Sequence, residues 1–282
     1  MKKVFLVLLV LTSLNITSQT KADSLLLTNN EWVNKDLDYL RFINDTVVYN
    51  LNNDKQELLF NINKRKLYFK VTYRSAGEIR NETFEFNIKE LQNNRLIIEP
   101  SAKDEAKLTQ YRKLNVNPLL KEKQYIFYNR GQLISRVNFK KITFHSSTCF
   151  GTCPSMSVEV NNDGTVYYNG RSYTGDYSGS FEGKLDAKNL LELRKIINRS
   201  QLYVLDQKWK QLTKHNDTPR YNYIVELANG KVIEINTNDQ HPILDKLSYY
   251  LLSITKKATL VKSEEKHTFA TSTIENYRVS RN

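Results

Sequence analysis

The 282-residue chain contains only two cysteines, five prolines and nine glycines. It carries no hydrolase, nucleotide-binding or metalloprotease signature and no internal repeat. Hydrophobic residues make up 40% of the chain and aromatic residues 11%, which is enough for packed strands and excludes a low-complexity linker protein. We therefore assign no catalytic residue and expect no cofactor.

The chain also lacks an apolar run long enough to cross a membrane. Lys2 and Lys3 precede the run Val4–Leu14, which is about half of the roughly 20 residues that a transmembrane helix needs. A basic start, a short apolar run and a polar stretch with small residues are typical of a secretory signal peptide. We expect residues 1–22 to be a signal peptide, the protein to be periplasmic or secreted, and no membrane span. No cysteine follows the run, so we expect no lipid anchor.

The formal net charge is +12, but the excess of positive charge is spread thinly. Residues 23–130 hold 18 basic and 15 acidic side chains, and residues 131–282 hold 21 and 15. The densest basic run, Lys64-Arg65-Lys66, is predicted to be a solvated turn beside a strand. Neither half forms a basic stripe, so no nucleic-acid partner is expected.

Glycine is scarce in the first half of the chain. Eight of the nine glycines lie between residues 131 and 230, and Gly77 is the exception. This shift in composition predicts a β-rich domain at residues 23–130 and a second domain at residues 131–257. The polar residues 258–282 that follow are predicted to be a mobile tail.

The first domain is predicted to consist of antiparallel strands. Residues 67–74 and 84–89 alternate apolar and polar side chains with a period of two, as half-buried strands do. Further strands are predicted at residues 40–49, 95–99 and 124–128. These strands favour a small antiparallel barrel or sandwich. Trp32, followed by strands rich in Phe and Tyr, resembles the small lipocalin-like domains of exported bacterial proteins.

The second domain is predicted to be an antiparallel sheet with two helices on one face, which makes the fold class α+β. The dipeptides Asp163-Gly164 and Asn229-Gly230 favour tight hairpin turns between apolar strands. Asp186 is placed to cap one helix and Pro242 to open another. Strands are predicted at residues 141–147, 156–160, 165–168, 221–227 and 231–237.

The most distinctive motif is Cys149-Phe150-Gly151-Thr152-Cys153-Pro154. Together with Asp163-Gly164-Thr165-Val166 and Asp217-Thr218-Pro219, it resembles a bacterial domain of unknown function that is common in exported proteins. The resemblance covers about residues 140–256. It implies a fold and a characteristic loop, but no reaction and no catalytic residue.

Two cysteines in a tight loop of an exported protein are expected to form a disulfide. Gly151 lets the intervening residues turn back, and Phe150 and Pro154 help to shape the loop. Closing so short a loop stabilises a protein by only about 2 kcal/mol, so the bridge would shape a surface feature more than hold a domain together.

A metal site is the alternative interpretation of the two cysteines. The spacing Cys-x-x-x-Cys-Pro is similar to the copper-binding loop of the Sco family of thioredoxin-like copper chaperones, in which two thiolates and a distant histidine bind the metal. The third ligand here would be His145, or else His215 or His241. In that family, however, the motif opens a helix, whereas Pro154 precedes a predicted strand. Thiol redox chemistry at the same cysteines is a further alternative.

The sequence thus predicts an exported, non-catalytic binding or envelope-associated module. Its partner would be an unknown envelope component, a peptide or a glycan. Four tyrosines lie among the glycines of the second domain and are candidates for an aromatic binding face, although packing within the sheet also explains them. They are Tyr167, Tyr168, Tyr173 and Tyr177. The alternative function is a copper-binding or thiol redox protein that uses Cys149 and Cys153.

Overall fold

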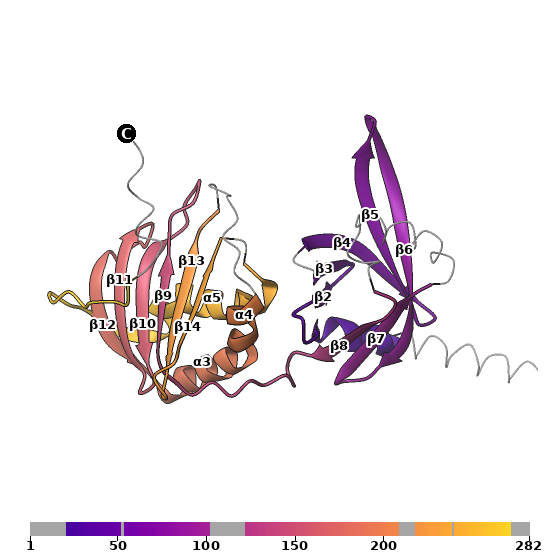
Figure 1. The fold of residues 1–282 in the computed structure, drawn as a ribbon. Helices are drawn as coiled ribbons and strands as arrows, with labels where there is room; N and C mark the ends of the chain where they lie inside the picture. The colour runs from indigo at the N-terminus through magenta and orange to yellow at the C-terminus, as the bar shows by residue number, and fades with distance from the viewer. Residues whose placement is uncertain (1–20, 52–53, 102–121, 209–217, 239, 272–282) are drawn as a thin grey trace, which may run out of the picture. The chain divides into compact units, whose positions relative to one another are not determined.

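The computed structural model of the protein describes residues 21–51, 54–101, 122–208, 218–238 and 240–271. The chain divides into two compact units, Met1–Leu133 and Ile134–Asn282 (Figure 1). The predicted signal peptide, residues 1–22, lies outside the described residues except for its last two positions. Within the described part of the chain, no helix combines the length and the apolar character needed to cross a membrane.

The first unit is a closed antiparallel barrel, in which eight strands of the described residues follow one another in chain order. They are β1 (Glu31–Val33), β2 (Tyr39–Ile43), β3 (Thr46–Leu51), β4 (Asp54–Asn63), β5 (Lys66–Ser75), β6 (Glu78–Leu91), β7 (Arg95–Pro100) and β8 (Tyr125–Asn129). Strand β1 closes the barrel on β8, with Trp32 opposite Asn129. Of the two predicted arrangements, barrel and sandwich, the unit adopts the barrel.

Two turns explain how the strands of this unit are divided. The segment 40–49, predicted as one strand, forms β2 and β3, because Asn44 adopts a left-handed φ of 54° and reverses the chain. Asparagine tolerates that conformation better than most residues. The predicted turn at Lys64-Arg65-Lys66 is confirmed: Lys64 and Arg65 both have positive φ, as a tight turn between β4 and β5 requires.

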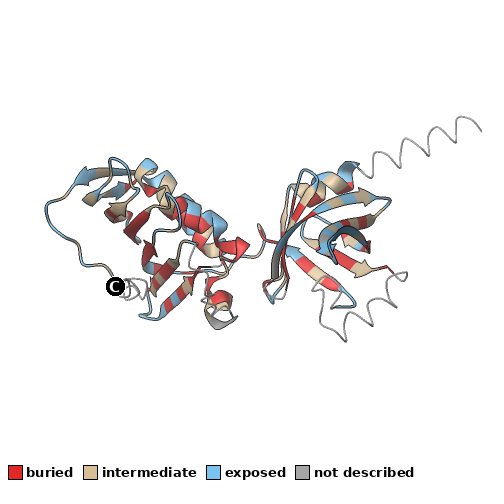
Figure 2. Ribbon diagram, turned by 90° about the horizontal axis from the view of Figure 1, so that it is seen from above, coloured by how far each residue is buried: buried red, intermediate tan, exposed pale blue. Residues whose placement is uncertain are grey.

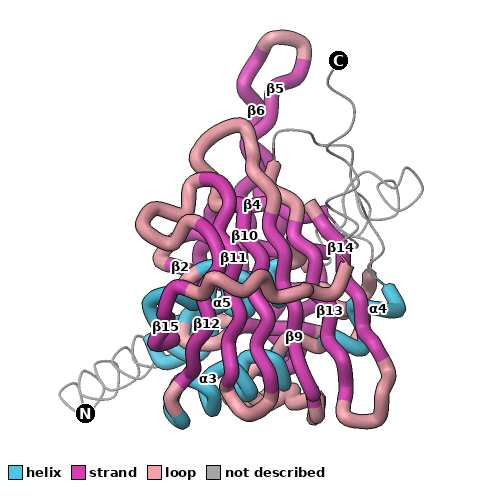
Figure 3. Tube along the Cα trace, turned by 90° about the vertical axis from the view of Figure 1, so that its left-hand side faces the viewer, coloured by secondary structure: helices cyan, strands magenta, loops and turns pink. Residues whose placement is uncertain are grey.

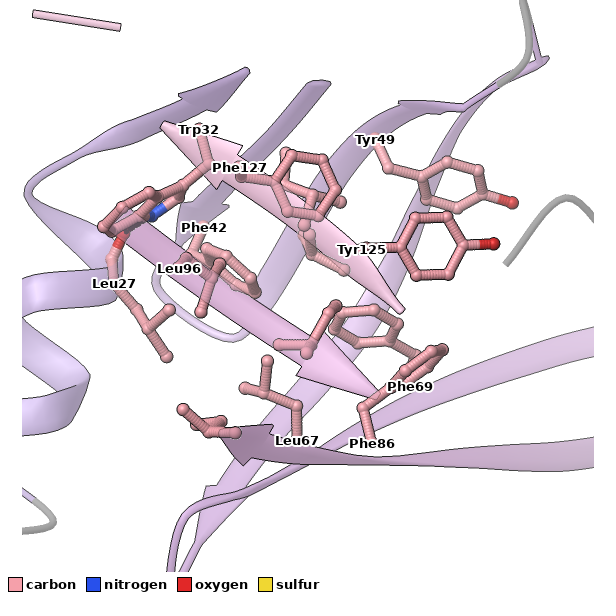
Figure 4. Close-up of a cluster of buried hydrophobic side chains, with 14 of the residues drawn as sticks. Leu27, Trp32, Phe42, Tyr49, Leu67, Phe69, Phe86, Leu96, Tyr125 and Phe127 are labelled. Carbon is pink, nitrogen blue, oxygen red and sulfur yellow. Dashed lines mark hydrogen bonds between the residues drawn. The ribbon is translucent and has the colours of Figure 1, made fainter. Parts of the chain in front are cut away.

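Aromatic side chains fill the barrel interior (Figure 4). Trp32, Phe42, Phe69, Phe86 and Phe127 are all at most 1% exposed and belong to one cluster. The helical residues 21–28 add to this cluster, since Leu27 is fully buried and its carbonyl accepts a hydrogen bond from the Trp32 indole Nε1 at 3.3 Å. Each such side chain contributes about 1.5–3 kcal/mol by leaving water, so the barrel has its own core.

The second unit contains a seven-stranded antiparallel sheet in the order β14-β13-β9-β10-β11-β12-β15, counted over the described residues. Its strands are β9 (Phe139–Ser146), β10 (Ser155–Asn161), β11 (Thr165–Ser172), β12 (Gly179–Leu185), β13 (Tyr221–Leu227), β14 (Val232–Thr237) and β15 (Ala258–Lys262). Its helices are α3 (Ala187–Arg199), α4 (Leu202–Lys208) and α5 (Asp245–Leu252), with the 3-10 turns η3 (Pro242–Leu244) and η4 (Ile254–Lys256). The α+β fold class is confirmed.

Helices α3 and α5 cover one face of this sheet (Figure 3). Buried residues occur along both the strands and the helices of this unit (Figure 2). Asp186 caps α3 as predicted, because its carboxylate accepts a hydrogen bond from the backbone nitrogen of Asn189 at 2.7 Å. Pro242 opens the 3-10 turn η3, and the α-helix itself begins at Asp245.

Strand β15 differs from the predicted mobile tail. Residues 258–262 pair antiparallel with β12, with Phe181 opposite Lys262 and Leu185 opposite Ala258. The two strands approach each other closely at Gly183, because a Cβ atom at that position would collide with the carbonyl of Thr259. Glycine also interrupts the alternation of apolar and polar residues in β12. For this reason periodicity predicted neither β12 nor its partner β15. The predicted tail residues 272–282 lie outside the described part of the chain.

Candidate functional site

The cysteine motif forms the loop between β9 and β10. The sulfur atoms of Cys149 and Cys153 lie at disulfide-bonding distance, and their Cα atoms are 5.5 Å apart. The Gly151 backbone nitrogen donates a hydrogen bond to the Cys149 carbonyl at 2.9 Å, which folds the loop into a three-residue turn. Gly151 has a φ of 155°, a value that side-chain-bearing residues rarely adopt.

Both ends of this loop are hydrogen-bonded to the sheet. At its end, the Ser146 hydroxyl donates to the Pro154 carbonyl at 2.7 Å. At its start, the Ser147 backbone nitrogen donates to the Arg220 carbonyl at 3.0 Å, and the Arg220 nitrogen donates to the Ser147 hydroxyl at 2.9 Å. The loop is therefore held by the cysteine pair within it and by the neighbouring strands at its base.

Two aromatic side chains face solvent at this end of the sheet. Phe150 is 91% exposed at the tip of the cysteine loop, and Tyr173 is 60% exposed in the loop between β11 and β12. The two loops leave the same end of the sheet, because Ser155 at the start of β10 lies opposite Ser172 at the end of β11. This end thus presents one apolar ring and one phenol ring.

The other predicted tyrosines do not form a single exposed face. Tyr168 is buried and packs edge-to-face with Tyr177 and Phe181, with ring centroids 6.3 and 6.1 Å away. Burial raises the pKa of Tyr168 to about 12. Tyr167 alternates with Tyr168 along β11 and so projects to the opposite face of the sheet. The hypothesis of one aromatic face built from all four tyrosines is therefore wrong.

The sheet face away from the helices carries a buried polar row. Residues directly opposite each other in neighbouring strands share a face, and His145 lies opposite both Ser157 and Asn222. The next residue along β13, Tyr223, hydrogen-bonds to Ser248 of α5, so Asn222 and its row point the other way. The polar residues of this face that are at most 2% exposed include Thr143, His145, Ser157, Glu159 and Asn222.

Arg171 connects this polar face to the base of the cysteine loop. Its Nη1 donates to the Ser157 hydroxyl at 2.8 Å and its Nε to the Ser155 hydroxyl at 3.1 Å. Its Nη2 donates to the carbonyl of Ser146, the residue whose hydroxyl binds Pro154. The planar guanidinium therefore links Ser146, Ser155 and Ser157, three strand residues beside the loop.

Glu159 is the buried acid of this face, with a side chain that is 3% exposed. Its Oε2 accepts hydrogen bonds from the Thr143 hydroxyl at 3.0 Å and from Lys141 Nζ at 3.1 Å. Its Oε1 lies 3.2 Å from Nε2 of His267. A buried carboxylate is stable only when it is paired and hydrogen-bonded in this way. Glu159 and its partners therefore form a preformed polar site.

His267 belongs to a segment, residues 263–271, that crosses the polar face in front of the strands (Figure 3). Its imidazole stacks on the Tyr167 ring, with centroids 3.8 Å apart and 3° between the planes. Farther along, the Phe269 ring lies edge-on to His145 at 6.2 Å, and the Ala270 carbonyl is 3.0 Å from His145 Nε2. Sequence reasoning placed these residues in the tail and missed all of these contacts.

The predicted third metal ligands have other partners. His145 Nδ1 lies 2.8 Å from the Ser157 hydroxyl, while its Nε2 faces the Ala270 carbonyl. His241 is buried, and its Nδ1 accepts a hydrogen bond from the Ile243 backbone nitrogen at 3.1 Å. His215 lies outside the described residues. In the part of the chain that the structure describes, no three His, Cys, Asp or Glu side chains are grouped to hold a metal ion.

Comparison with known proteins identifies one domain in the chain. Residues 140–255 match the family model of a domain of unknown function, DUF6438. The match begins in β9 and includes the cysteine loop, the polar face and α5. No curated protein and no solved structure matches the chain. The expected domain of unknown function is therefore confirmed, and the match assigns no reaction to it.

Proposed function

We propose that the protein is an exported, non-catalytic binding module that contacts its partner through the loop Cys149–Cys153. The observation that carries this proposal is the exposure of Phe150, 91%, at the tip of a loop fixed at both ends. A partner that buries this ring gains apolar contact without having to order the loop first. Buried aromatic anchors of this kind dominate the energetics of many interfaces.

Exposed apolar side chains are common, and most need no functional explanation. Tyr249, which is 74% exposed on α5, is of this ordinary kind. Phe150 differs because its backbone is constrained by the cysteine pair and by Ser146 and Ser147. Tyr173 adds a second exposed ring at the same end of the sheet. Together the two rings suit a peptide side chain or the apolar face of a sugar in an envelope component.

Export is part of this proposal, and it is supported by the amino-terminal pattern and by the cysteine pair, which requires an oxidising compartment. The mature chain should begin between Gln19 and Ser24. Cleavage there retains Leu27, the buried residue that the barrel needs. The test is an intact-mass measurement on exported material, and a mass that includes Met1 would contradict export with cleavage.

The binding proposal is tested with two probe libraries, phage-displayed 12-residue peptides and an array of immobilised oligosaccharides. Ligands selected on the wild-type chain are measured again on Phe150→Ala, with Tyr249→Ala as the matched control that removes an exposed ring elsewhere. We expect Phe150→Ala to weaken binding at least tenfold, about 1.4 kcal/mol, and the control to leave it unchanged. Equal affinities for wild type and Phe150→Ala would contradict the proposal.

A further inference from the structure

The polar face of the second sheet is covered by a length of chain that is neither helix nor strand. Residues 263–271 follow β15 and run across the strands instead of pairing alongside them (Figure 3). In the middle of the segment, His267 and Phe269 are partly buried, while Thr268 between them is exposed. An extended peptide with one side against a surface places successive side chains in this way.

Each group of that segment that points toward the sheet has a partner on the polar face. The Tyr167 ring is a platform for the His267 imidazole, and the Glu159 carboxylate lies 3.2 Å from its Nε2. Phe269 packs edge-on against His145, and His145 Nε2 faces the backbone carbonyl of Ala270 at 3.0 Å. A stacking ring, a carboxylate and a donor to the backbone, placed on the neighbouring strands β11, β10 and β9, are the elements of a peptide-recognition site.

We propose that this face is a binding site for an extended peptide of another protein, and that residues 264–271 of the chain occupy it as an internal ligand. The peptide carries a planar nitrogen donor, His or Arg, that stacks on Tyr167 and bonds to Glu159. An aromatic residue follows two positions later and packs on His145. The site is distinct from the exposed Phe150 and does not depend on it.

The contacts of the internal ligand allow exchange. Ser263 stays attached when the segment leaves, since its backbone nitrogen donates to the Ser180 carbonyl at 2.9 Å beside β15. Glu159 keeps its hydrogen bonds from Thr143 and Lys141 after His267 departs, so no unpaired buried charge is created. Because the segment is tethered, it competes with other peptides at a high effective concentration. Weakly binding peptides therefore do not displace it, whereas tightly binding ones do.

The experiment uses a fluorescein-labelled synthetic peptide with the sequence of residues 264–271, measured by fluorescence anisotropy. The receptor is the chain truncated after Ser263, which keeps β15, and the full chain is measured beside it. We expect saturable binding to the truncated chain and at least tenfold weaker binding to the full chain. Absence of binding to the folded truncated chain, or equal binding to both chains, would overturn the proposal.

Substitutions locate the site and remain informative if the truncated chain does not fold. Peptides with His267→Ala or Phe269→Ala should bind at least tenfold more weakly, whereas Thr268→Ala, on the exposed side, should match the parent within twofold. Glu159→Gln in the receptor should weaken binding tenfold, and Phe150→Ala should not change it, which separates this proposal from the previous one.

If the truncated chain is unfolded by circular dichroism, the full-length double variant His267→Ala, Phe269→Ala serves as receptor. Failure of that variant to bind the peptide more tightly than the wild-type chain would overturn the proposal.

Discussion

The imidazole of His267 lies parallel to the phenol ring of Tyr167, with 3.8 Å between the ring centroids. This stack joins the segment after the last strand to the middle of the sheet, and it places His267 Nε2 beside the buried carboxylate of Glu159. A buried carboxylate is costly unless it is paired and hydrogen-bonded, and Thr143, Lys141 and His267 supply those partners for Glu159. We therefore regard the face as a specific surface and not as a packing accident.

The cysteine pair gives the first prediction. Protein isolated under non-reducing conditions should contain no alkylatable thiol, and the double variant Cys149→Ser, Cys153→Ser should stay folded and lose at most about 2 kcal/mol in urea unfolding. Loop closure over so few residues stabilises little, so a larger loss would show that the loop holds the domain.

The same preparation tests the copper alternative. Two thiolates and an imidazole suit Cu(I), but His145 is already hydrogen-bonded through both ring nitrogens. We expect no tight stoichiometric binding in a Cu(I) competition titration of the reduced protein. Two free thiols in fresh protein together with tight binding that His145→Ala weakens would replace the binding-module account with the copper account.

The second prediction concerns the link between the two units. Arg130 is 3% exposed and paired with Glu31, whereas Arg136 is exposed. Within residues 129–138, brief trypsin treatment should therefore cut after Arg136 and leave a resistant carboxyl-terminal fragment with both cysteines. Mass spectrometry identifies the cut, and Arg136→Gln is the control that should remove it. Early cleavage after Arg130 would contradict the buried pair.

The ion pair of Glu31 and Arg130 gives the third prediction. Their side chains are 11% and 4% exposed, so removing the Glu31 charge breaks an ion pair that is shielded from water. Glu31→Gln should lower the free energy of unfolding of the barrel by about 3 to 5 kcal/mol. The control is Glu226→Gln at the solvent-exposed pair with Lys140, which should leave the urea midpoint unchanged. Similar midpoints for the two variants would be evidence against a stabilising role of the buried pair.

The fourth prediction is a loss of stability at alkaline pH. Burial raises the pKa of Tyr168 to about 12, above its usual value of 10.0. Its contribution is therefore fully present below pH 10 and is lost as the pH rises toward 12, because the unfolded phenol ionises first. Urea midpoints measured from pH 8 to 11 should fall, and Tyr168→Phe should reduce the steepness of the fall. The same steepness in the variant would show that other groups account for it.

Local signals explain which elements were predictable from the sequence. The alternating residues 67–74 and 84–89 lie within β5 and β6, and Asp186 caps α3, because these patterns depend only on near neighbours. Strand β12 was missed because Gly179 and Gly183 interrupt its alternation, and β15 because its pairing partner was missed. At residues 40–49, apolar residues on both sides of Asn44 and Asp45 predicted one strand, although both residues favour turns.

The candidate site was only partly predictable for a different reason. The cysteine motif marks its own loop, but Phe150 was predicted only to help shape that loop, and its exposure of 91% came from the structure. The contact between Glu159 and His267 joins residues 108 positions apart, and neither lies in a motif. The periodicity of a sequence does not indicate which face of a sheet an irregular segment will cover. This part of the site could therefore be found only from the structure.

The most direct test of the binding-module account is photo-crosslinking from the loop tip in the producing cells. Phe150 is replaced by p-benzoylphenylalanine, a ring of similar character that inserts into nearby C–H bonds of peptides and glycans alike, and Tyr249 is replaced in the same way as the control. The account predicts a discrete crosslinked product from position 150 that disappears in the Cys149→Ser, Cys153→Ser background, and none from position 249. Identical products from both positions, or no product from position 150, would contradict it.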